Sequence, residues 1–181
     1  NKYDFFLSNT ERDRAKSFVS SMGDKIKIGI NIEGSFPEKS IQKKELEQIC
    51  RGLYSHCSNI KIVILASSNQ IIKKQKMISE LGLDYVIPSY TTETIIDAAA
   101  IIEQLDLIIT PDTAIVHIAS SFDKPVVSIH ENNKDSFRLW SPSSTLSKTI
   151  FAKSSYGLFD YSVNDIVESA VDMLQTIESD T

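Results

Sequence analysis

Short runs of β-branched and other apolar residues recur along the chain, with helical periodicity between them. The six runs cover residues 26–32, 60–66, 84–87, 106–110, 125–129 and 148–152. In most of them the apolar residues follow one another instead of alternating with polar ones, which is typical of strands that helices cover on both faces of a parallel sheet. The pattern therefore predicts an alternating β and α layout.

Helical periodicity is clearest near the end of the sequence. There, apolar residues at steps of three and four form one stripe that we expect to pack on the sheet: Val163, Ile166, Val167, Ala170, Val171, Leu174 and Ile177. An earlier helix is predicted over residues 11–22, with Ala15, Phe18, Val19 and Met22 on one face. This earlier helix is a candidate arm that joins the domain to another one.

Strands joined by crossover helices predict an α/β fold with a single Rossmann-like, doubly wound parallel sheet. We expect the strand order 3-2-1-4-5-6, because crossover connections are right-handed. In such a sheet the winding reverses between strands one and four, and ligands bind at this reversal. Two loops should face each other there, residues 33–40 after the first strand and residues 110–113 after the fourth.

The first loop, EGSFPEKS, is a candidate anion-binding site. Gly34 allows a tight turn, Ser35 offers a hydroxyl donor, and Lys39 is a cation that we expect to be exposed. The loop is not a Walker-type nucleotide loop, because Ser35 and Phe36 follow Gly34 where Lys and Ser or Thr are required. The sequence also lacks a Gly-x-Gly-x-x-Gly dinucleotide motif. An ordinary solvated loop is the alternative interpretation.

The second loop leads into an apolar helical run, ITPDTAIVHIASSF. Asp112 stands where an N-cap is expected. The backbone N–H groups of Thr113 and Ala114 would then point into the crevice, and such a helix start favours phosphate. His117, one turn later, should project from the same face. The alternative is an ordinary capped helix with a core-facing histidine.

Composition narrows the possible classes of protein. Hydrophobic residues make up 41% of 181 residues, enough for the interior of one domain, so we expect neither disorder nor a coiled coil. The net charge of −5 argues against nucleic acid as a partner. Apolar runs reach about five residues, against roughly 18 for a membrane span, so we expect no transmembrane segment.

The two cysteines, Cys50 and Cys57, lie on one predicted helix, where seven residues separate their Cα atoms by about 10.5 Å. That separation excludes a disulfide. His56 adjoins Cys57, but no second Cys or His pair has zinc-ligand spacing, so neither a metal nor a cofactor is predicted. Two half-buried helix cysteines indicate a reducing, cytoplasmic compartment. The sequence opens without Met and without a basic, apolar, small-residue signal pattern, so we expect Asn1 to be the edge of a domain cut from a longer protein.

The segment DLIITPDTAIVHIASSFDKPVVSIH resembles the signature of glycosyltransferase family nine, the ADP-heptose:lipopolysaccharide heptosyltransferases. That signature is Asp-Thr-Gly-x-x-His-x-Ala followed by Lys or Arg, Pro and an apolar strand. The matching positions are Asp112, Thr113, His117, Ala119, Lys124 and Pro125, and Ala114 replaces the usual glycine. The EGSFPEKS loop resembles the family's phosphate-binding loop, Trp140 and Pro142 resemble its W-x-P element, and residues 160–174 resemble its closing helix.

The resemblance implies that residues 1–181 are the C-terminal, donor-binding half of a two-domain GT-B enzyme. The N-terminal domain, absent from this sequence, would bind a lipid-linked oligosaccharide acceptor and carry the catalytic base. The implied reaction is inverting transfer of heptose or a related sugar from an ADP-sugar to the core of lipopolysaccharide or lipooligosaccharide. The chain alone would then bind donor without turnover, in the cytoplasm and with a peripheral location at the inner membrane as an option.

The resemblance also implies roles for individual residues in holding the pyrophosphate. Lys39 and Ser35, in the loop that Gly34 turns, would neutralise it on one side. The amides of Thr113 and Ala114 would bind its oxygens on the other. No Asp-x-Asp motif occurs in the sequence, so we expect these groups to act in place of a carboxylate-held metal.

The nucleoside and sugar would contact further loops. Tyr90 is expected to contact adenine, and the loop from Ser67 to Gln70 would hold the ribose, with Gln70 where the family offers a glutamate. Asp112 would cap its helix and bind sugar hydroxyls, and His117 would support a phosphate or the sugar. Glu33 also lies at the crevice but has no second carboxylate at a spacing that indicates acid–base catalysis.

Two other classes of protein are alternatives to this interpretation. A receiver domain requires an aspartate after strand three and a lysine after strand five, whereas this chain has Ile87-Pro88 and Ile129-His130, so that class is excluded. A non-catalytic sugar-nucleotide sensor, or a family member with another donor, stays open because Ala114 and Gln70 both depart from the family pattern.

Overall fold

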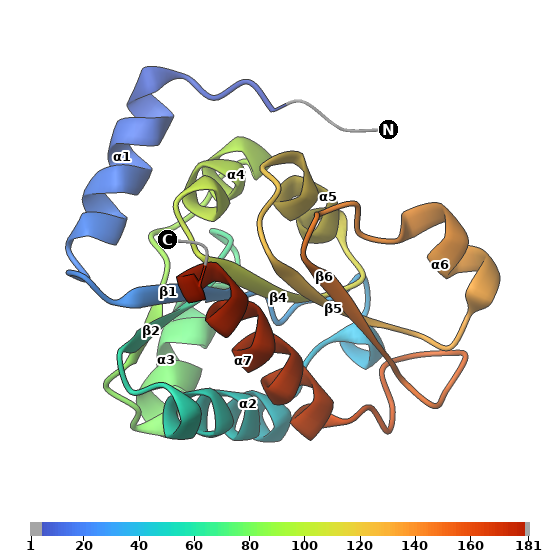
Figure 1. The fold of residues 1–181 in the computed structure, drawn as a ribbon. Coiled ribbons are helices and arrows are strands. Elements are labelled where there is room, and N and C mark those ends of the chain that lie inside the picture. The colour runs from blue at the N-terminus through green and yellow to red at the C-terminus, as the bar shows by residue number, and fades with distance from the viewer. Residues whose placement is uncertain (1–4, 180–181) are drawn as a thin grey trace.

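The computed structural model describes residues 5–179, which form one α/β unit (Figure 1). Within this range six parallel strands form a sheet in the order β3-β2-β1-β4-β5-β6. The strands are β1 Ile26–Ile30, β2 Ile60–Ile64, β3 Val86–Pro88, β4 Leu107–Pro111, β5 Val126–His130 and β6 Ser147–Phe151. The predicted fold class and strand order are confirmed.

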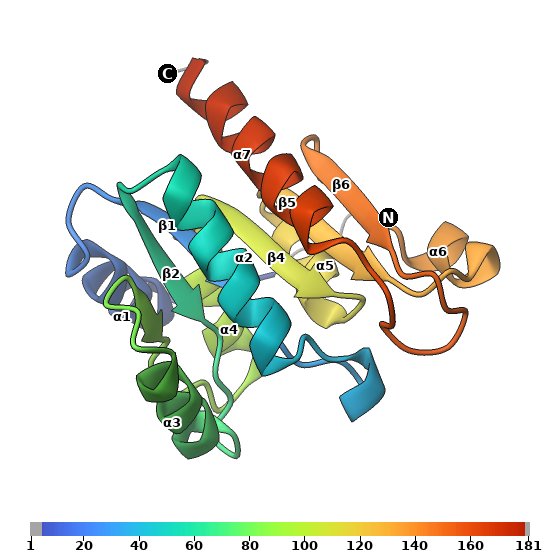
Figure 2. The same cartoon turned by 90° about the horizontal axis from the view of Figure 1, so that it is seen from below.

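Helices alternate with the strands along the described chain. They are α1 Asn9–Ser20, the short 3-10 helix η1 Pro37–Lys39, α2 Lys43–His56, α3 Ile71–Leu81, α4 Ile95–Glu103, α5 Ala114–Ser121, α6 Lys134–Trp140 and α7 Val163–Ser179. Helices α2, α3 and α7 cover one face of the sheet, and α1, α4 and α5 cover the other (Figure 2).

The core therefore has two apolar layers, one on each face of the sheet. Strand β2 illustrates the arrangement, because Ile62 and Ile64 pack into the layer under α2, α3 and α7, whereas Val63 packs into the other layer. All three side chains are fully buried. Burial on both faces explains why the strands have consecutive apolar residues in the sequence.

The predicted C-terminal stripe is confirmed in α7, which packs against α2. Ile166 and Ala170 are fully buried in this contact. A Cβ atom at Gly52 of α2 would lie 2.8 Å from Cγ2 of Val167, so the glycine allows the two helices to approach closely. This helix pair closes one side of the core.

The first helix begins two residues earlier than predicted because Ser8 and Glu11 form a capping box at its start. It packs against α4, with Ala15 buried and the Nε of Arg12 lying 3.2 Å from Glu103. The helix that the sequence offered as an arm to another domain therefore packs, as α1, in the outer layer of this domain.

Both cysteines have free thiols, as predicted. Cys50 is fully buried, which corrects the expectation of a half-buried side chain, and burial raises the pKa of its thiol to about 12. Cys57 is half-buried at the end of α2.

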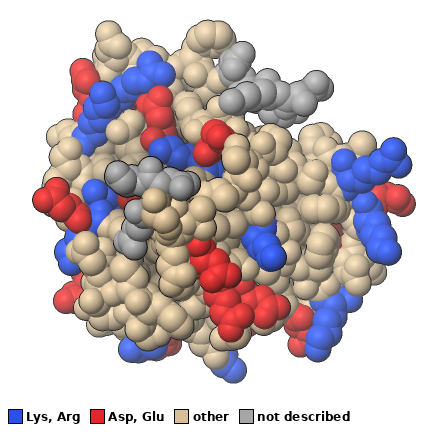
Figure 3. All heavy atoms as spheres, in the orientation of Figure 1, with Lys and Arg blue, Asp and Glu red and all other residues tan. Residues whose placement is uncertain are grey.

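The surface carries charges of both signs. Figure 3 shows Lys and Arg side chains interspersed with Asp and Glu over the face seen in Figure 1, with no broad basic field. No helix formed by residues 5–179 is both long and apolar enough to cross a lipid bilayer. Within the same residues, no group of three His, Cys, Asp or Glu side chains lies where it could share a metal ion.

Candidate functional site

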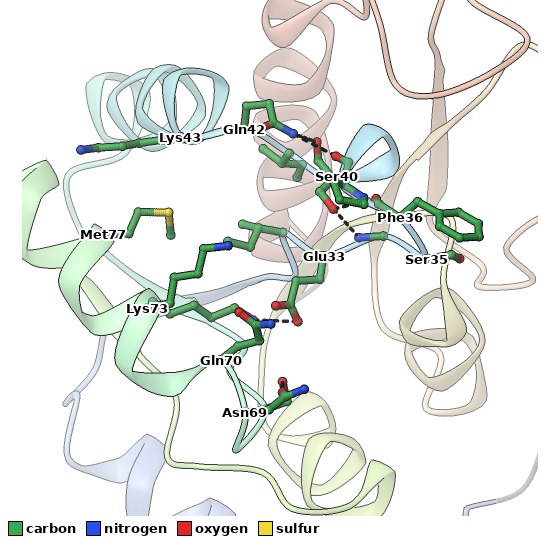
Figure 4. A pocket seen from close by; sticks show the side chains of 16 residues that line it. Glu33, Ser35, Phe36, Ser40, Gln42, Lys43, Asn69, Gln70, Lys73 and Met77 are labelled. Carbon is green, nitrogen blue, oxygen red and sulfur yellow. Dashed lines mark hydrogen bonds and ion pairs between the residues drawn. The ribbon is translucent and has the colours of Figure 1, made fainter.

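The carboxyl ends of β1, β2 and β4 meet at one edge of the sheet, where the winding reverses. Two cavities open there. The larger, of about 480 Å³, lies between the loop after β1 and helix α3 (Figure 4). The smaller, of about 340 Å³, lies between the end of β2, residues 92–98 and the start of α5. Glu33, Ser67 and Lys74 line both cavities.

Asn31 joins the two strands at the reversal. The residue is 7% exposed, and its Nδ2 lies 3.1 Å from Oγ1 of Thr110 and 3.3 Å from Oγ1 of Thr113. The same amide makes two hydrogen bonds to the backbone of Glu33. Its Nδ2 donates to the Glu33 carbonyl at 2.9 Å, and its Oδ1 accepts from the Glu33 N–H at 3.2 Å. A carboxamide suits this position because it donates and accepts. Asn31 therefore fixes the loop after β1 against the start of α5.

The predicted N-cap of α5 was wrong by one residue. Thr113 caps the helix, with Oγ1 accepting a hydrogen bond from the N–H of Ile115 at 3.3 Å. Asp112 still belongs to the sheet ladder, because its N–H donates to the carbonyl of Ile129 at 3.0 Å. Thr113 and Ala114 line the smaller cavity, as the placement of the helix start predicts.

Asp112 approaches a buried histidine that the sequence analysis did not propose for the site. Its Oδ2 lies 3.5 Å from Nδ1 of His130, whose side chain is 2% exposed. Burial lowers the pKa of His130, His117 lowers it further, and Asp112 opposes this shift. Within residues 5–179, Nε2 of His130 has no hydrogen-bond partner. The ring packs edge-on against Phe137.

Lys39 is not the exposed loop cation that we expected. Its Nζ lies 2.9 Å from Oε2 of Glu131, which follows β5, and its side chain is only 30% exposed. Burial alone would raise the pKa of Glu131, but the N–H of Gly157 and the Lys39 ammonium hold that pKa below its ordinary value. Lys39 lines neither cavity.

The loop between β1 and α2 has the tight turn that Gly34 predicts. The N–H of Gly34 donates to Oγ of Ser40 at 3.0 Å, and a Cβ atom at position 34 would overlap the carbonyl of Lys39. The N–H of Ile41 then returns to the carbonyl of Ile32 at 2.9 Å and closes the loop. Gly34 and Ser35 line the larger cavity.

The loop after β2 contributes the two residues that the family resemblance indicated. Ser67 lines both cavities, and its Oγ donates to Oδ1 of Asn69 at 2.7 Å. Gln70 immediately precedes α3 and lines the larger cavity (Figure 4). Both positions are compatible with contact to a ligand in the crevice.

Tyr90 faces helix α1 and lines neither cavity. Its ring makes an edge contact with Phe18, with centroids 5.4 Å apart, and the Arg14 guanidinium lies 4.1 Å from the ring centre. The smaller cavity is walled nearby by Thr92 and Ile95. The contact of Tyr90 with adenine stays a prediction, and this placement gives it no support.

His117 and Trp140, which belong to two separate motifs, come together in the fold. Their ring centroids are 5.7 Å apart in an edge contact between α5 and the end of α6. His117 lies one turn beyond Thr113, as predicted, but it lines neither cavity.

Sequence reasoning missed Lys74, whose side chain is only 3% exposed. Its Nζ donates to the carbonyl of Leu65 at 2.6 Å and lies 3.1 Å from Oε2 of Glu33. Burial lowers the pKa of Lys74, and Glu33 opposes that shift. A signal was present in the sequence, since Lys74 lies one turn before Ile78 on the same face of α3, the face that the fold buries.

Comparisons with known proteins identify the family of the chain. The model of glycosyltransferase family 9 (heptosyltransferase) matches residues 1–155. A curated Escherichia coli K12 protein, provisionally named lipopolysaccharide heptosyltransferase 4, is 25% identical over 149 residues, which are 77% of this chain and 37% of that protein.

Solved structures share the fold. A family 9 glycosyl transferase from Veillonella parvula DSM 2008 superposes with a TM-score of 0.78 at 20% identity, covering 95% of this chain and 53% of that one. The E. coli ADP-heptose lipopolysaccharide heptosyltransferase II superposes with a TM-score of 0.73 at 17% identity, covering 97% of this chain and 54% of that one. The E. coli heptosyltransferase WaaC with ADP superposes with a TM-score of 0.69 at 14% identity, covering 88% of this chain and 48% of that one.

The chain thus spans about half the length of these solved relatives and just over a third of the curated one. The family model extends over most of the chain, including both loops at the sheet reversal and helix α5. The chain belongs to glycosyltransferase family 9, the heptosyltransferase family.

Proposed function

We propose that this chain is the nucleotide-sugar-binding domain of an inverting glycosyltransferase, with an ADP-sugar as donor. The transferred sugar would be heptose or a related sugar, and the acceptor would be the core of lipopolysaccharide or lipooligosaccharide. The observation that carries the proposal is the smaller cavity, where Thr113 and Ala114 at the start of α5 meet the ends of β1 and β2.

This cavity suits the diphosphate of such a donor. A helix start offers N–H groups and partial positive charge, which favour an anion. The small side chain of Ala114 leaves room for an oxygen atom to approach the backbone, and Asn31 holds the facing strand end in place through Thr113. Asn31 therefore fixes the end of β1 against the start of α5 beside this cavity.

The chemical contribution of the domain would be to stabilise the leaving group. When the bond from the anomeric carbon to the diphosphate breaks, negative charge grows on the diphosphate oxygens, and fixed donors stabilise that charge. Lys39, whose Nζ lies 2.9 Å from Oε2 of Glu131, lines neither cavity.

The catalytic base is assigned to the other half of the enzyme. Of the described residues lining the two cavities, the carboxylates are Glu33 and Glu93, and Glu33 is paired with Lys74. The chain spans only about half of its solved relatives, which leaves room for an acceptor domain with a base. We therefore propose that the isolated chain binds donor without turnover, and that the full protein works in the cytoplasm, at the inner membrane where its lipid-linked acceptor lies.

Family membership and the solved WaaC complex with ADP support an ADP-sugar as donor. A second candidate is a family member with another donor, or a sensor without transferase activity. The packing of Tyr90 against Phe18 and Arg14 favours this second candidate, because it removes the expected adenine contact from the cavities.

Calorimetry of the isolated chain at low salt tests the proposal. We expect ADP to bind more tightly than UDP or GDP, and an ADP-sugar to bind without release of free ADP. Preference for UDP would keep the fold and change the donor. Absence of binding by all three nucleotides at millimolar concentration would contradict the donor-domain assignment. Transfer from ADP-heptose to a core oligosaccharide should require the full-length protein.

A further inference from the structure

Lys74 is buried at the wall that separates the two cavities, and it lines both. A lysine that is 3% exposed is uncommon, because removing an ammonium from water is costly unless it is paired. Replacing a buried ion pair by apolar residues is often neutral or stabilising, so stability alone does not account for a lysine here. Its position at the sheet reversal points to a role in binding.

The two side chains of the Lys74–Glu33 ion pair differ in how far they can move. Lys74 is anchored on α3, and its Nζ is fixed by the Leu65 carbonyl at 2.6 Å. Glu33 lies on the loop after β1, and its side chain is 37% exposed. Figure 4 shows the Glu33 side chain extending from this loop towards α3. The cation is thus fixed, while the carboxylate has space to turn into solvent.

The donor count of the ammonium is also informative. Lys74 has three N–H donors, and the Leu65 carbonyl and the Glu33 carboxylate account for two of them. If Glu33 turned away, two donors of a fixed cation would face the cavities. A phosphate oxygen would then take the place of the carboxylate and keep the ammonium paired.

We propose that Lys74 is a phosphate-binding cation of the donor cleft, and that Glu33 is an internal competitor which a phosphate group displaces. This inference rests on the proposed function, because it names the residue that would bind the diphosphate of the donor. Lys74 shares the smaller cavity with Thr113 and Ala114, so a diphosphate there has the ammonium and the start of α5 within one cavity. Lys39 lines neither cavity and is held by Glu131.

Burial and charge explain why the competitor is needed. Burial lowers the pKa of Lys74, and the neighbouring Glu33 raises it, so the carboxylate helps to keep the ammonium protonated. A phosphate with equal or greater negative charge would do the same after the exchange. Glu33 therefore keeps the Lys74 ammonium protonated when no phosphate is bound. A ligand with too little negative charge would not displace the Glu33 carboxylate.

The test is a double-mutant cycle with inorganic pyrophosphate as the titrant, followed by calorimetry at constant low salt. Charge-assisted contacts of this kind predict that Glu33→Gln tightens binding about tenfold and that Lys74→Met weakens it by about tenfold or more. In the Lys74→Met background, Glu33→Gln should change the affinity by less than about twofold. Lys76→Met, on the exposed face of the same helix, is the matched control for loss of one positive charge.

Each outcome decides the inference. If Glu33→Gln tightened pyrophosphate binding equally in the parent chain and in the Lys74→Met variant, the effect of Glu33 would be simple charge repulsion, and the competition would be overturned. An unchanged affinity for pyrophosphate in the single variant Glu33→Gln would also overturn the competition. Because Glu33→Gln leaves Lys74 in place, it remains decisive if Lys74→Met fails to fold. Pyrophosphate binding that follows the cycle, without preference among ADP, UDP and GDP, would support the inference while contradicting the proposed donor.

Discussion

The Lys39 ammonium and the Glu131 carboxylate, separated by 92 residues in the sequence, lie 2.9 Å apart. Glu131 also accepts a hydrogen bond from the N–H of Gly157, so the pair ties η1 to the loops after β5 and β6. The carbonyl of Glu38 accepts from the N–H of Leu158 at 2.7 Å and reinforces the same connection. Lys39 therefore has a structural role in addition to any role in binding.

Replacing Lys39 should lower stability, contrary to the behaviour of an exposed loop lysine. Since the side chain is partly exposed, we expect Lys39→Met to reduce the free energy of unfolding by about 1 kcal/mol, and the effect should shrink at high salt. Urea denaturation at two salt concentrations measures this. Lys148→Met, on the exposed part of the edge strand β6, is a suitable control. Equal losses in the two variants would contradict a specific pair.

The start of α5 gives a second prediction, because Thr113 and not Asp112 caps the helix. Thr113→Ala should lower the free energy of unfolding by about 0.5 to 2 kcal/mol through loss of the cap. The change also removes an acceptor for the buried amide of Asn31, which places the expected loss in the upper part of this range. Asp112→Ala should cost less. Thermal unfolding of the two variants compares them, and a larger loss for Asp112→Ala would contradict the assignment of the cap.

The sheet was predictable because its signal is local. Each strand is a short apolar run, and right-handed crossovers leave few possible orders, so the reversal between β1 and β4 follows from the pattern. Gly34 was also predictable, since a tight turn after a strand favours glycine. The chemistry-bearing loops were thus placed at the correct edge from the sequence.

The contacts inside the site were not predictable in the same way. Asp112 looked like a cap because its type fits, but pairing of its N–H with Ile129 keeps it in the sheet ladder. The partner of Lys39 comes from a loop 92 residues away. Lys74 could have been found, because a lysine on the buried face of a helix requires a partner.

His130 gives a pH-dependent prediction. Its pKa lies below the ordinary value because burial disfavours the charged ring, while Asp112 opposes this shift. A histidine whose folded pKa is lowered stabilises the fold above its unfolded pKa, about 6.5, and this stability is lost as the pH falls towards the folded value. Asp112→Asn removes the opposing charge. We therefore expect a lower pKa for His130 and a steeper loss of stability below about pH 6.5.

Two measurements check this behaviour. Proton NMR titration of the ring, assigned with His130→Gln, gives the pKa of His130 directly. Melting temperatures measured between pH 7.5 and pH 5.0 show how stability depends on the protonation of this ring. That interval extends about one pH unit or more on each side of the ordinary histidine pKa. His56→Gln, which alters an exposed ring at the end of α2, is the control for the titration. A higher pKa in Asp112→Asn than in the parent would show that Asp112 does not stabilise the protonated ring.

The two thiols should differ in reactivity, because the thiolate is the nucleophile. Burial raises the pKa of Cys50 to about 12, and the side chain is fully buried between α2 and the sheet, whereas Cys57 is half-buried at the end of the same helix. We expect a maleimide at neutral pH to modify Cys57 first, and Cys50 only as the protein unfolds in urea. Mass spectrometry of the peptides after timed labelling identifies the modified residue. Cys57→Ser should remove the fast phase and leave the slow one, so rapid labelling of Cys50 in this variant would mean that α2 opens in the folded protein.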